Sequence, residues 1–185
     1  MNNKIIFLDI DTQYDFMNPR GKLYVPGAEK LIPNLRHLFR LAKKNNIPII
    51  SSLDTHKRND AEFKYFAAHC IKGSRGHKKI REALSKKVRQ IFIKKHTIDI
   101  FSNPQIKRVL KPYQTAYVFG VALDYCVKTA CLGLVELGVK TYLIKDATKA
   151  VSNKGKREAL RLLKEKGVIT LTTNTVINRL NSIRF

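Results

Sequence analysis

The chain has 185 residues, of which 36 are Lys or Arg and 14 are Asp or Glu, so its formal net charge is +22. This length suits one domain spanning residues 1–185, and 44% hydrophobic residues exclude an acidic disordered chain. No apolar run approaches the roughly 20 residues needed to cross a bilayer, which excludes a membrane protein. Because three cysteines are too few for a disulfide framework and the N-terminus lacks a signal-peptide pattern, we expect a cytoplasmic protein.

Six short apolar segments, rich in β-branched and aromatic residues, predict strands. They span residues 4–10, 47–53, 90–94, 115–120, 140–144 and 168–172. Their apolar residues are largely continuous, which is typical of strands covered by helices on both faces. Helical spacing of apolar residues occurs within 31–42, 126–137 and 159–163. The alternation predicts a single-domain α/β fold: a doubly wound, Rossmann-like sheet of six parallel strands with helices on both faces.

Polar residues follow three of the predicted strands, whose carboxyl ends meet at one edge of such a sheet. The first strand leads to Asp11, and the second leads to Asp54 and His56. The fourth leads through Gly120 to Cys126, where a helix is expected to begin. The long polar connection over residues 54–78 lies where an α/β fold keeps its chemistry.

Cys126 is a candidate nucleophile because a helix N-terminus lowers a thiol pKa and offers free N–H groups to an oxyanion. Most free cysteines are instead small buried hydrophobes, and this is our interpretation of Cys131. Lys95 follows the third predicted strand and would hold a carboxylate and a thiolate in register if it reached Asp11 and Cys126. Together the acid, the cation and the thiol would supply the base, the anchor and the nucleophile of amide hydrolysis.

A second cluster of polar residues suggests a metal site. Asp54, His56, Glu62 and His69 lie within 16 residues. Mixed histidine and carboxylate ligands suit Zn, Mn or Fe better than Mg or Ca, without choosing among the first three. Taken singly, each of these residues is more typical of a solvated loop, and His77, among lysines, is assigned to the surface.

These motifs resemble those of the cysteine hydrolases of the isochorismatase-like superfamily and, within it, the nicotinamidases. The resemblance runs from Ile5 to about Thr172. The segment 11–16, Asp-Thr-Gln-Tyr-Asp-Phe, is similar to the family motif D-x-Q-x-D-F, whose first Asp is the general base. Lys95 with the following D-x-F matches the family lysine, and segment 120–127 resembles G-x-A-T-D-x-C-V, which carries the nucleophile.

The resemblance also implies details of the site. It implies a cis peptide between Val121 and Ala122, and an oxyanion hole formed by the backbone N–H groups of Ala122 and Cys126. Phe16 and Phe66 are expected to flank a flat heteroaromatic ring, with Val121 also contacting the substrate. Leu123 stands where the family usually has Thr.

The polar connection resembles the family's metal loop, D-x-H followed by H-C-x-x-G-T-x-G. Many members have a third histidine four residues after the first, and this position is Asp60 here. Some bacterial members use a glutamate seven residues before the last histidine, which is the spacing of Glu62 to His69. The resemblance therefore implies one divalent transition metal, Zn first with Mn or Fe open. The implied ligands are Asp54, His56, Glu62 and His69. Asp60 is a second candidate for the carboxylate position.

Two departures fall in this loop. Ala67 and Ala68 follow Phe66 where the family has an aromatic residue, Pro and one further residue, and Thr55 replaces a frequent Trp.

The reaction implied by the resemblance is hydrolysis of nicotinamide, and of pyrazinamide-type analogues, to the acid and ammonia through a Cys126 thioester. Such an enzyme would serve NAD salvage, and a homo-oligomer is expected. The alternative within the superfamily is a hydrolase of N-carbamoyl compounds or ureides, whose members generally lack a full metal loop.

The positive charge supports one hypothesis from a different class, a nucleic-acid-binding protein. Between Lys72 and Lys95 there are ten basic residues and one acid, Glu82. A protein that neutralises several phosphates binds RNA or DNA with a steep salt dependence. The stretch has few aromatic residues for base stacking and matches no recognition motif, so we rank this hypothesis below an enzyme.

Overall fold

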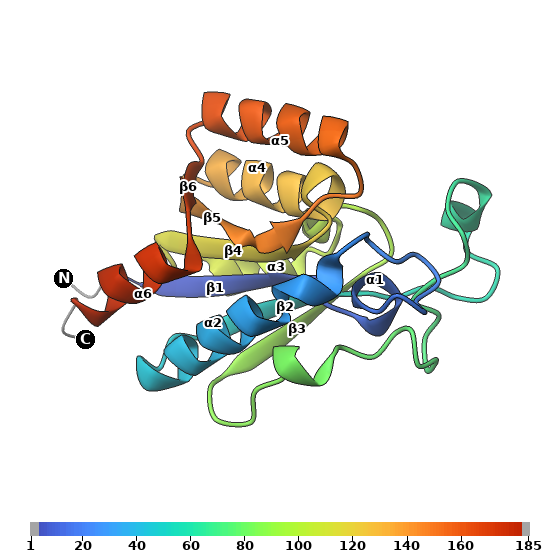
Figure 1. Cartoon of the computed structure of the whole chain (residues 1–185), viewed down its shortest axis with the longest axis horizontal. Coiled ribbons are helices and arrows are strands. Elements are labelled where there is room, and N and C mark those ends of the chain that lie inside the picture. The colour runs from blue at the N-terminus through green and yellow to red at the C-terminus, as the bar shows by residue number, and fades with distance from the viewer. Residues whose placement is uncertain (1–3, 183–185) are drawn as a thin grey trace.

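A single six-stranded sheet organises the computed structural model, which describes residues 4–182 (Figure 1). The strands are β1 (Ile5–Ile10), β2 (Ile49–Asp54), β3 (Gln90–Lys95), β4 (Thr115–Val121), β5 (Lys140–Lys149) and β6 (Ile169–Leu171). Their order across the sheet is β3-β2-β1-β4-β5-β6, and every neighbouring pair is parallel. This order confirms the predicted doubly wound fold.

Helices cover both faces of the sheet (Figure 1). They are α1 (Tyr14–Met17), α2 (Ile32–Lys44), α3 (Gln105–Leu110), α4 (Lys128–Glu136), α5 (Asn153–Glu165) and α6 (Thr173–Asn181). Because successive side chains of a strand point to opposite faces, β1 contributes Phe7 to one buried cluster and Leu8 to the other. The Phe7 cluster includes Leu35 of α2 and Val176 of α6, whereas the Leu8 cluster includes Ala130 of α4. None of the helices within residues 4–182 is long and apolar enough to cross a membrane.

The predicted elements are present, but several ends differ. β5 continues five residues beyond the predicted end at residue 144, and its pairing with β4 shifts register between Val118 and Gly120. Helix α6 was not predicted, because its buried stripe consists of only Val176 and Leu180 besides Thr173 at its start. Its N-terminus is capped by Thr172, whose side chain accepts a hydrogen bond from the backbone N–H of Thr175.

The fold opens a crevice at the carboxyl ends of β1 and β4, where the connections leave the sheet in opposite directions. The segment between β2 and β3 returns across this crevice and forms isolated bridges, one between Gln13 and Lys79 and one between His56 and Ile71. Gly76 is required there, because a Cβ atom at this position would collide with the Asp15 carboxylate. The long polar connection is thereby fixed against the end of β1.

Candidate active site

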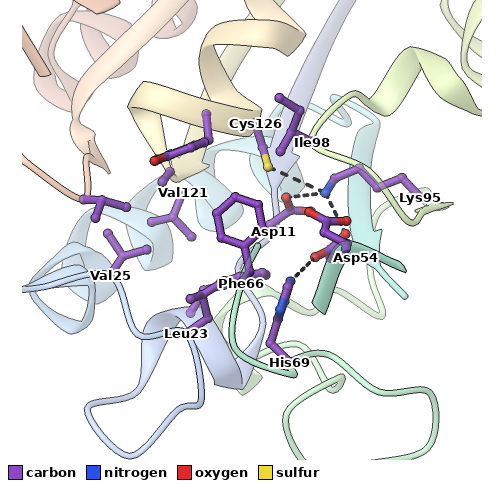
Figure 2. A pocket seen from close by; sticks show the side chains of 15 residues that line it. Asp11, Leu23, Val25, Asp54, Phe66, His69, Lys95, Ile98, Val121 and Cys126 are labelled. Atoms are coloured by element: carbon purple, nitrogen blue, oxygen red, sulfur yellow. Dashed lines mark hydrogen bonds and ion pairs between the residues drawn. The ribbon is translucent and has the colours of Figure 1, made fainter. Parts of the chain in front are cut away.

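A narrow cavity of about 110 Å³ lies at the carboxyl ends of the strands (Figure 2). It brings together residues at the ends of β2, β3 and β4 with residues from the connections that follow β1, β2, β3, β4 and β5. The lining residues are Asp11, Phe16, Leu23, Val25, Asp54, Glu62, Phe66, His69, Lys95, Ile98, Val121, Ala122, Tyr125, Cys126 and Val151. The cavity therefore contains every predicted site residue except His56, which lies directly behind it against Asp54.

Lys95 joins the predicted base and nucleophile. Its Nζ lies 2.8 Å from Oδ2 of Asp11 and 3.7 Å from Sγ of Cys126, as Figure 2 shows. The structure adds one contact that the sequence did not indicate, because the same Nζ lies 3.0 Å from Oδ1 of Asp54. One buried ammonium therefore connects the acid, the thiol and the cluster of possible metal ligands.

The surroundings of the Cys126 thiol disfavour its thiolate form. Burial raises its pKa well above the ordinary range; Lys95 lowers the pKa, and the carboxylates of Asp11 and Asp54 raise it again. The lowered thiol pKa expected from a helix N-terminus is therefore not found here. Burial alone would lower the pKa of Lys95, but its anionic neighbours raise it well above the usual value, so this side chain is a cation.

The nucleophile candidate lies on a distorted turn rather than at the start of a regular helix. After β4 the peptide between Val121 and Ala122 is cis, as the resemblance implied. Tyr125 has non-helical dihedrals of φ −126° and ψ −107°, and α4 begins only at Lys128. Cys126 therefore precedes the helix by two residues, and its side chain reaches the cavity beside Lys95.

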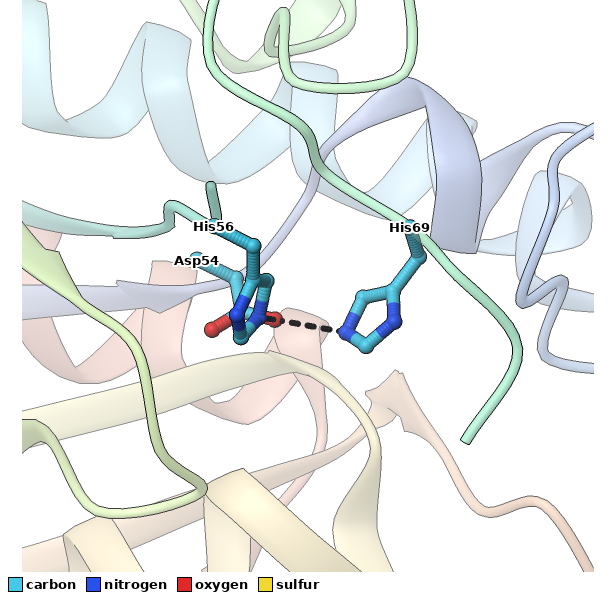
Figure 3. Close-up of side chains that lie close together, drawn as sticks. All are labelled: Asp54, His56 and His69. Atoms are coloured by element: carbon cyan, nitrogen blue, oxygen red, sulfur yellow. Dashed lines mark hydrogen bonds and ion pairs between the residues drawn. The ribbon is translucent and has the colours of Figure 1, made fainter. Parts of the chain in front are cut away.

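The predicted metal ligands also converge (Figure 3). Oδ2 of Asp54 lies 3.0 Å from Nε2 of His56 and 3.0 Å from Nε2 of His69. Glu62 approaches from the same side, with its Oε2 3.8 Å from Nε2 of His56. The ligand atoms of Asp54 and the two histidines all lie within 4.8 Å of one another. Nitrogen and carboxylate donors at this spacing fit a divalent transition metal.

The far nitrogens of both histidine rings have partners of their own. Nδ1 of His69 is hydrogen-bonded to the carbonyl oxygen of Ala67 at 2.7 Å. Nδ1 of His56 lies 3.1 Å from Oδ2 of Asp60, an ion-pair contact outside hydrogen-bond geometry. A partner on the outer nitrogen orients a metal-binding imidazole. Here Nε2 of each ring faces Asp54 and the position that an ion would take. The second candidate, Asp60, therefore contacts the outer side of a ligand ring, whereas Glu62 faces the inner side.

The electrostatics of the cluster favour a bound cation. Burial raises the pKa of Glu62, and the nearby carboxylate of Asp54 raises it further. Burial would lower the pKa of His56, but Asp54, Asp60 and Glu62 raise it to about 9. In Asp54 the opposing contributions of Lys95 and the two histidines outweigh burial and lower the pKa. The three carboxylates therefore stabilise positive charge at this point.

Two polar residues of the segment 11–16 support the cluster from behind. The side chain of Gln13 donates to the carbonyl oxygen of Asp54 at 2.8 Å and accepts from its N–H at 2.7 Å. The carboxylate of Asp15 accepts from the N–H groups of Cys70, at 2.8 Å, and Lys22, at 3.0 Å. The motif marked these positions in the sequence, but their structural roles had not been assigned.

One surface assignment is wrong. His77 is half-buried, and its Nε2 lies 2.9 Å from Oγ1 of Thr55. Burial and the nearby Lys94 lower the pKa of His77. Its position between lysines in the sequence concealed that the segment folds back behind β2.

An apolar wall closes the other side of the cavity. Phe16 lies 5.4 Å from the ring of His69, and Phe66 lies 6.1 Å from the ring of Tyr125, measured between ring centroids. Both phenylalanines and Val121 line the cavity. Sequence reasoning missed further apolar residues of the wall, which come from separate loops and form no periodic pattern. These are Leu23, Val25, Ile98, Tyr125 and Val151.

Comparisons with known proteins identify the family and the fold of the chain. The isochorismatase domain family matches residues 6–175. Over 188 residues the chain is 24% identical to the nicotinamidase of Saccharomyces cerevisiae, covering 78% of this chain and 87% of that protein. The zinc complex of the Pyrococcus horikoshii pyrazinamidase superposes with a TM-score of 0.85 at 25% identity, covering 91% of this chain and 99% of that one.

The fold is shared with a hydrolase of another substrate class. The N-carbamoylsarcosine amidase of Thermoplasma acidophilum superposes with a TM-score of 0.80 at 21% identity, covering 92% of this chain and 96% of that one. This likeness shows the fold alone and does not choose between substrates. The family match covers more than half of the chain, and the protein therefore belongs to the isochorismatase domain family.

Proposed function

We propose that this protein is a metal-dependent cysteine amidohydrolase that converts nicotinamide to nicotinate and ammonia and also accepts pyrazinamide-type analogues. The observation that carries the proposal is the shared contact of Lys95 with Asp11, Cys126 and Asp54. This contact connects a nucleophile, a proton acceptor and a group of metal-binding residues in one cavity with an apolar wall. The similar nicotinamidase and pyrazinamidase support the same reaction class.

The chemistry starts from a neutral thiol, so proton transfer has to accompany attack. Asp11 accepts the proton of Cys126 while the sulfur adds to the amide carbon. The backbone N–H groups of Ala122 and Cys126 stabilise the oxyanion, and Lys95 balances the negative charge on Asp11. Asp11 then returns the proton to the departing ammonia. In the second half of the cycle, Asp11 deprotonates the water that attacks the thioester carbon, and as the C–S bond breaks it passes this proton to the departing sulfur of Cys126, which restores the thiol.

The metal-binding residues in this proposal are Asp54, His56, Glu62 and His69, with Asp60 orienting the ring of His56. When bound, a Zn²⁺ ion would supply a Lewis acid that a pyridine or pyrazine nitrogen can ligate. Zn is favoured by the donor set and by the zinc in the similar pyrazinamidase, and Mn or Fe suit the same donors.

The charge of the cavity favours an uncharged amide over an N-carbamoyl acid. Lys95 is the only Lys or Arg among the residues that line it, and it already contacts two carboxylates. Apart from a bound metal, a substrate carboxylate would find no free cation among the lining residues, and its lost hydration would cost several kcal/mol. Between Phe16 and Phe66 the wall instead suits a flat ring.

The test is ammonia release from nicotinamide, pyrazinamide and N-carbamoylsarcosine, with metal content measured on the same sample. We expect turnover of the two ring amides, about one equivalent of bound metal, and no turnover in Cys126→Ala. Cys131→Ala is the matched control, because Cys131 is a buried thiol outside the cavity. Equal nicotinamide turnover by wild type and Cys126→Ala would refute the mechanism. Faster release from N-carbamoylsarcosine would instead support the alternative substrate class.

A further inference from the structure

A second buried ion pair lies beside the first and takes no part in the proposed chemistry. Nζ of Lys79 lies 2.7 Å from Oδ2 of Asp9, and their side chains are 2% and 0% exposed. Asp9 also accepts hydrogen bonds from the hydroxyls of Ser51, at 2.8 Å, and Thr12, at 2.7 Å. Neither charged residue lines the cavity.

Stability alone is a weak reason for such a pair. Removing two charges from water is costly, and replacing a buried pair by apolar residues of similar volume is often neutral or stabilising. What a hydrogen-bonded pair adds is a defined geometry between the segments that carry it. Here these segments are β1, which carries Asp9, and the returning end of the metal-binding loop, which carries Lys79.

Lys79 contacts both strands that carry the site carboxylates. Besides Asp9 on β1, its Nζ donates to the carbonyl oxygen of Ser52 on β2, at 3.3 Å. Asp9 lies two residues before Asp11, and Ser52 lies two residues before Asp54. Lys79 thus connects β1 at Asp9 with β2 at Ser52, one residue beyond Ser51, the register partner of Asp9. Both contacts lie two residues before the carboxylates that Lys95 connects.

Hydrogen bonds connect Lys79 and its contacts with the site residues Asp11 and Asp54. The hydroxyl of Ser52 donates to Oδ1 of Asp11 at 2.6 Å and accepts from the Asp11 N–H at 2.9 Å. The backbone of Lys79 forms a bridge with Gln13, whose side chain holds both backbone groups of Asp54. The position of Lys79 is therefore coupled to Asp11 through Ser52 and to Asp54 through Gln13.

We propose that Lys79 is a positioning residue which, paired with Asp9, sets the separation between Asp11 and Asp54. Lys79 thereby aligns the proton acceptor Asp11 with the metal-binding residues. The inference rests on the proposed function for the role of Asp11, but its effect on the metal-binding residue Asp54 can be measured without turnover.

The experiment compares zinc-loaded wild type with Lys79→Met, the double variant Asp9→Leu/Lys79→Met, and Thr12→Val. Lys78→Met is the control, because it removes an exposed lysine next to Lys79. We measure the unfolding temperature, kcat and KM for nicotinamide, and the zinc Kd by chelator competition. Lys79→Met should be destabilised because it leaves the Asp9 carboxylate buried and unpaired, and the double variant should regain most of that loss.

If Lys79 positions the site, the double variant keeps a kcat about 10- to 100-fold below wild type and a zinc Kd raised by a similar factor, with a smaller change in KM. A double variant with wild-type stability, kcat and zinc Kd would show that the pair is only structural and would overturn the proposal. If the double variant does not fold, the Thr12→Val variant provides the test, because it removes a hydrogen bond to Asp9 and leaves the Asp9–Lys79 ion pair in place. A Thr12→Val variant with wild-type kcat and zinc Kd would then overturn the proposal. Wild type without nicotinamide turnover would refute the proposed function, and the zinc titration then tests Lys79 by itself.

Discussion

The carboxylate of Asp60 lies 3.1 Å from Nδ1 of His56, on the side of the ring that faces away from Asp54. Glu62 approaches Nε2 of the same ring, the nitrogen that Asp54 also faces. The two acids nearest to His56 along the loop therefore act on opposite nitrogens. In the proposed metal site this arrangement would make Glu62 a ligand and Asp60 the outer partner of a ligand.

The two roles predict different losses of metal affinity. Asp60→Asn should raise the zinc Kd about 10- to 100-fold, because an outer partner of a histidine ligand is weakened but the ligand set is kept. Glu62→Gln should raise it more, since it removes a negative donor from the ion itself. Chelator competition measures both, with Glu158→Gln on the exposed face of α5 as the control. A larger increase of the zinc Kd in Asp60→Asn than in Glu62→Gln would mean that Asp60 is the ligand and Glu62 the outer partner.

The raised pKa of Cys126 predicts how this thiol reacts with iodoacetamide. Because alkylation requires the thiolate, the rate should be low at pH 7 and increase about tenfold per pH unit through pH 9. Cys70 and Cys131 are fully buried, so peptide mass spectrometry should find the label on Cys126 alone. A rate that is already constant between pH 6 and pH 8 would mean a lowered pKa and would contradict the neutral resting thiol.

The contacts of Lys95 predict that its charge is needed for both activity and stability. Lys95→Gln leaves the carboxylates of Asp11 and Asp54 facing each other in a buried site, so we expect a loss of about 3–5 kcal/mol in the free energy of unfolding. We also expect kcat to decrease at least a hundredfold. Chemical denaturation and steady-state kinetics measure the two effects. Lys94→Gln, which changes the exposed neighbouring lysine, should leave both near wild type.

The convergence of the central residues could be predicted because parallel strands place their carboxyl ends at one edge. Asp11, Lys95 and Cys126 all lie at or just after such ends, and the structure brings them together. The burial of Lys79 gave no signal, since a lysine among other lysines has the pattern of a solvated segment. Its partner Asp9 lies inside a strand of apolar residues. Only the tertiary structure shows that Lys79 is the cation that pairs with it.

Cavity residues on loops that lie far apart in the chain could not be predicted from sequence patterns either. Val151 enters the cavity after β5, and no spacing in the sequence connects it with the turn before Cys126. The structure supplies the connection through Asp124, whose carboxylate accepts hydrogen bonds from the N–H groups of Val151, at 3.0 Å, and Ser152, at 3.3 Å. This side chain fixes the loop after β5 to the turn that carries the nucleophile.

The link through Asp124 predicts an effect on substrate binding more than on the chemical step. Asp124→Ala removes two hydrogen bonds that hold Val151 at the cavity, while Asp11, Lys95 and Cys126 keep their mutual contacts. Each such bond contributes about 0.5–1.5 kcal/mol, and only the bond to Val151 acts directly on the cavity wall. KM for nicotinamide should therefore increase about 2- to 10-fold, with a smaller decrease in kcat. Steady-state kinetics on wild type and variant measure the split. A variant with unchanged KM and a strongly reduced kcat would instead indicate that Asp124 supports the nucleophile turn and leaves the cavity wall unaffected.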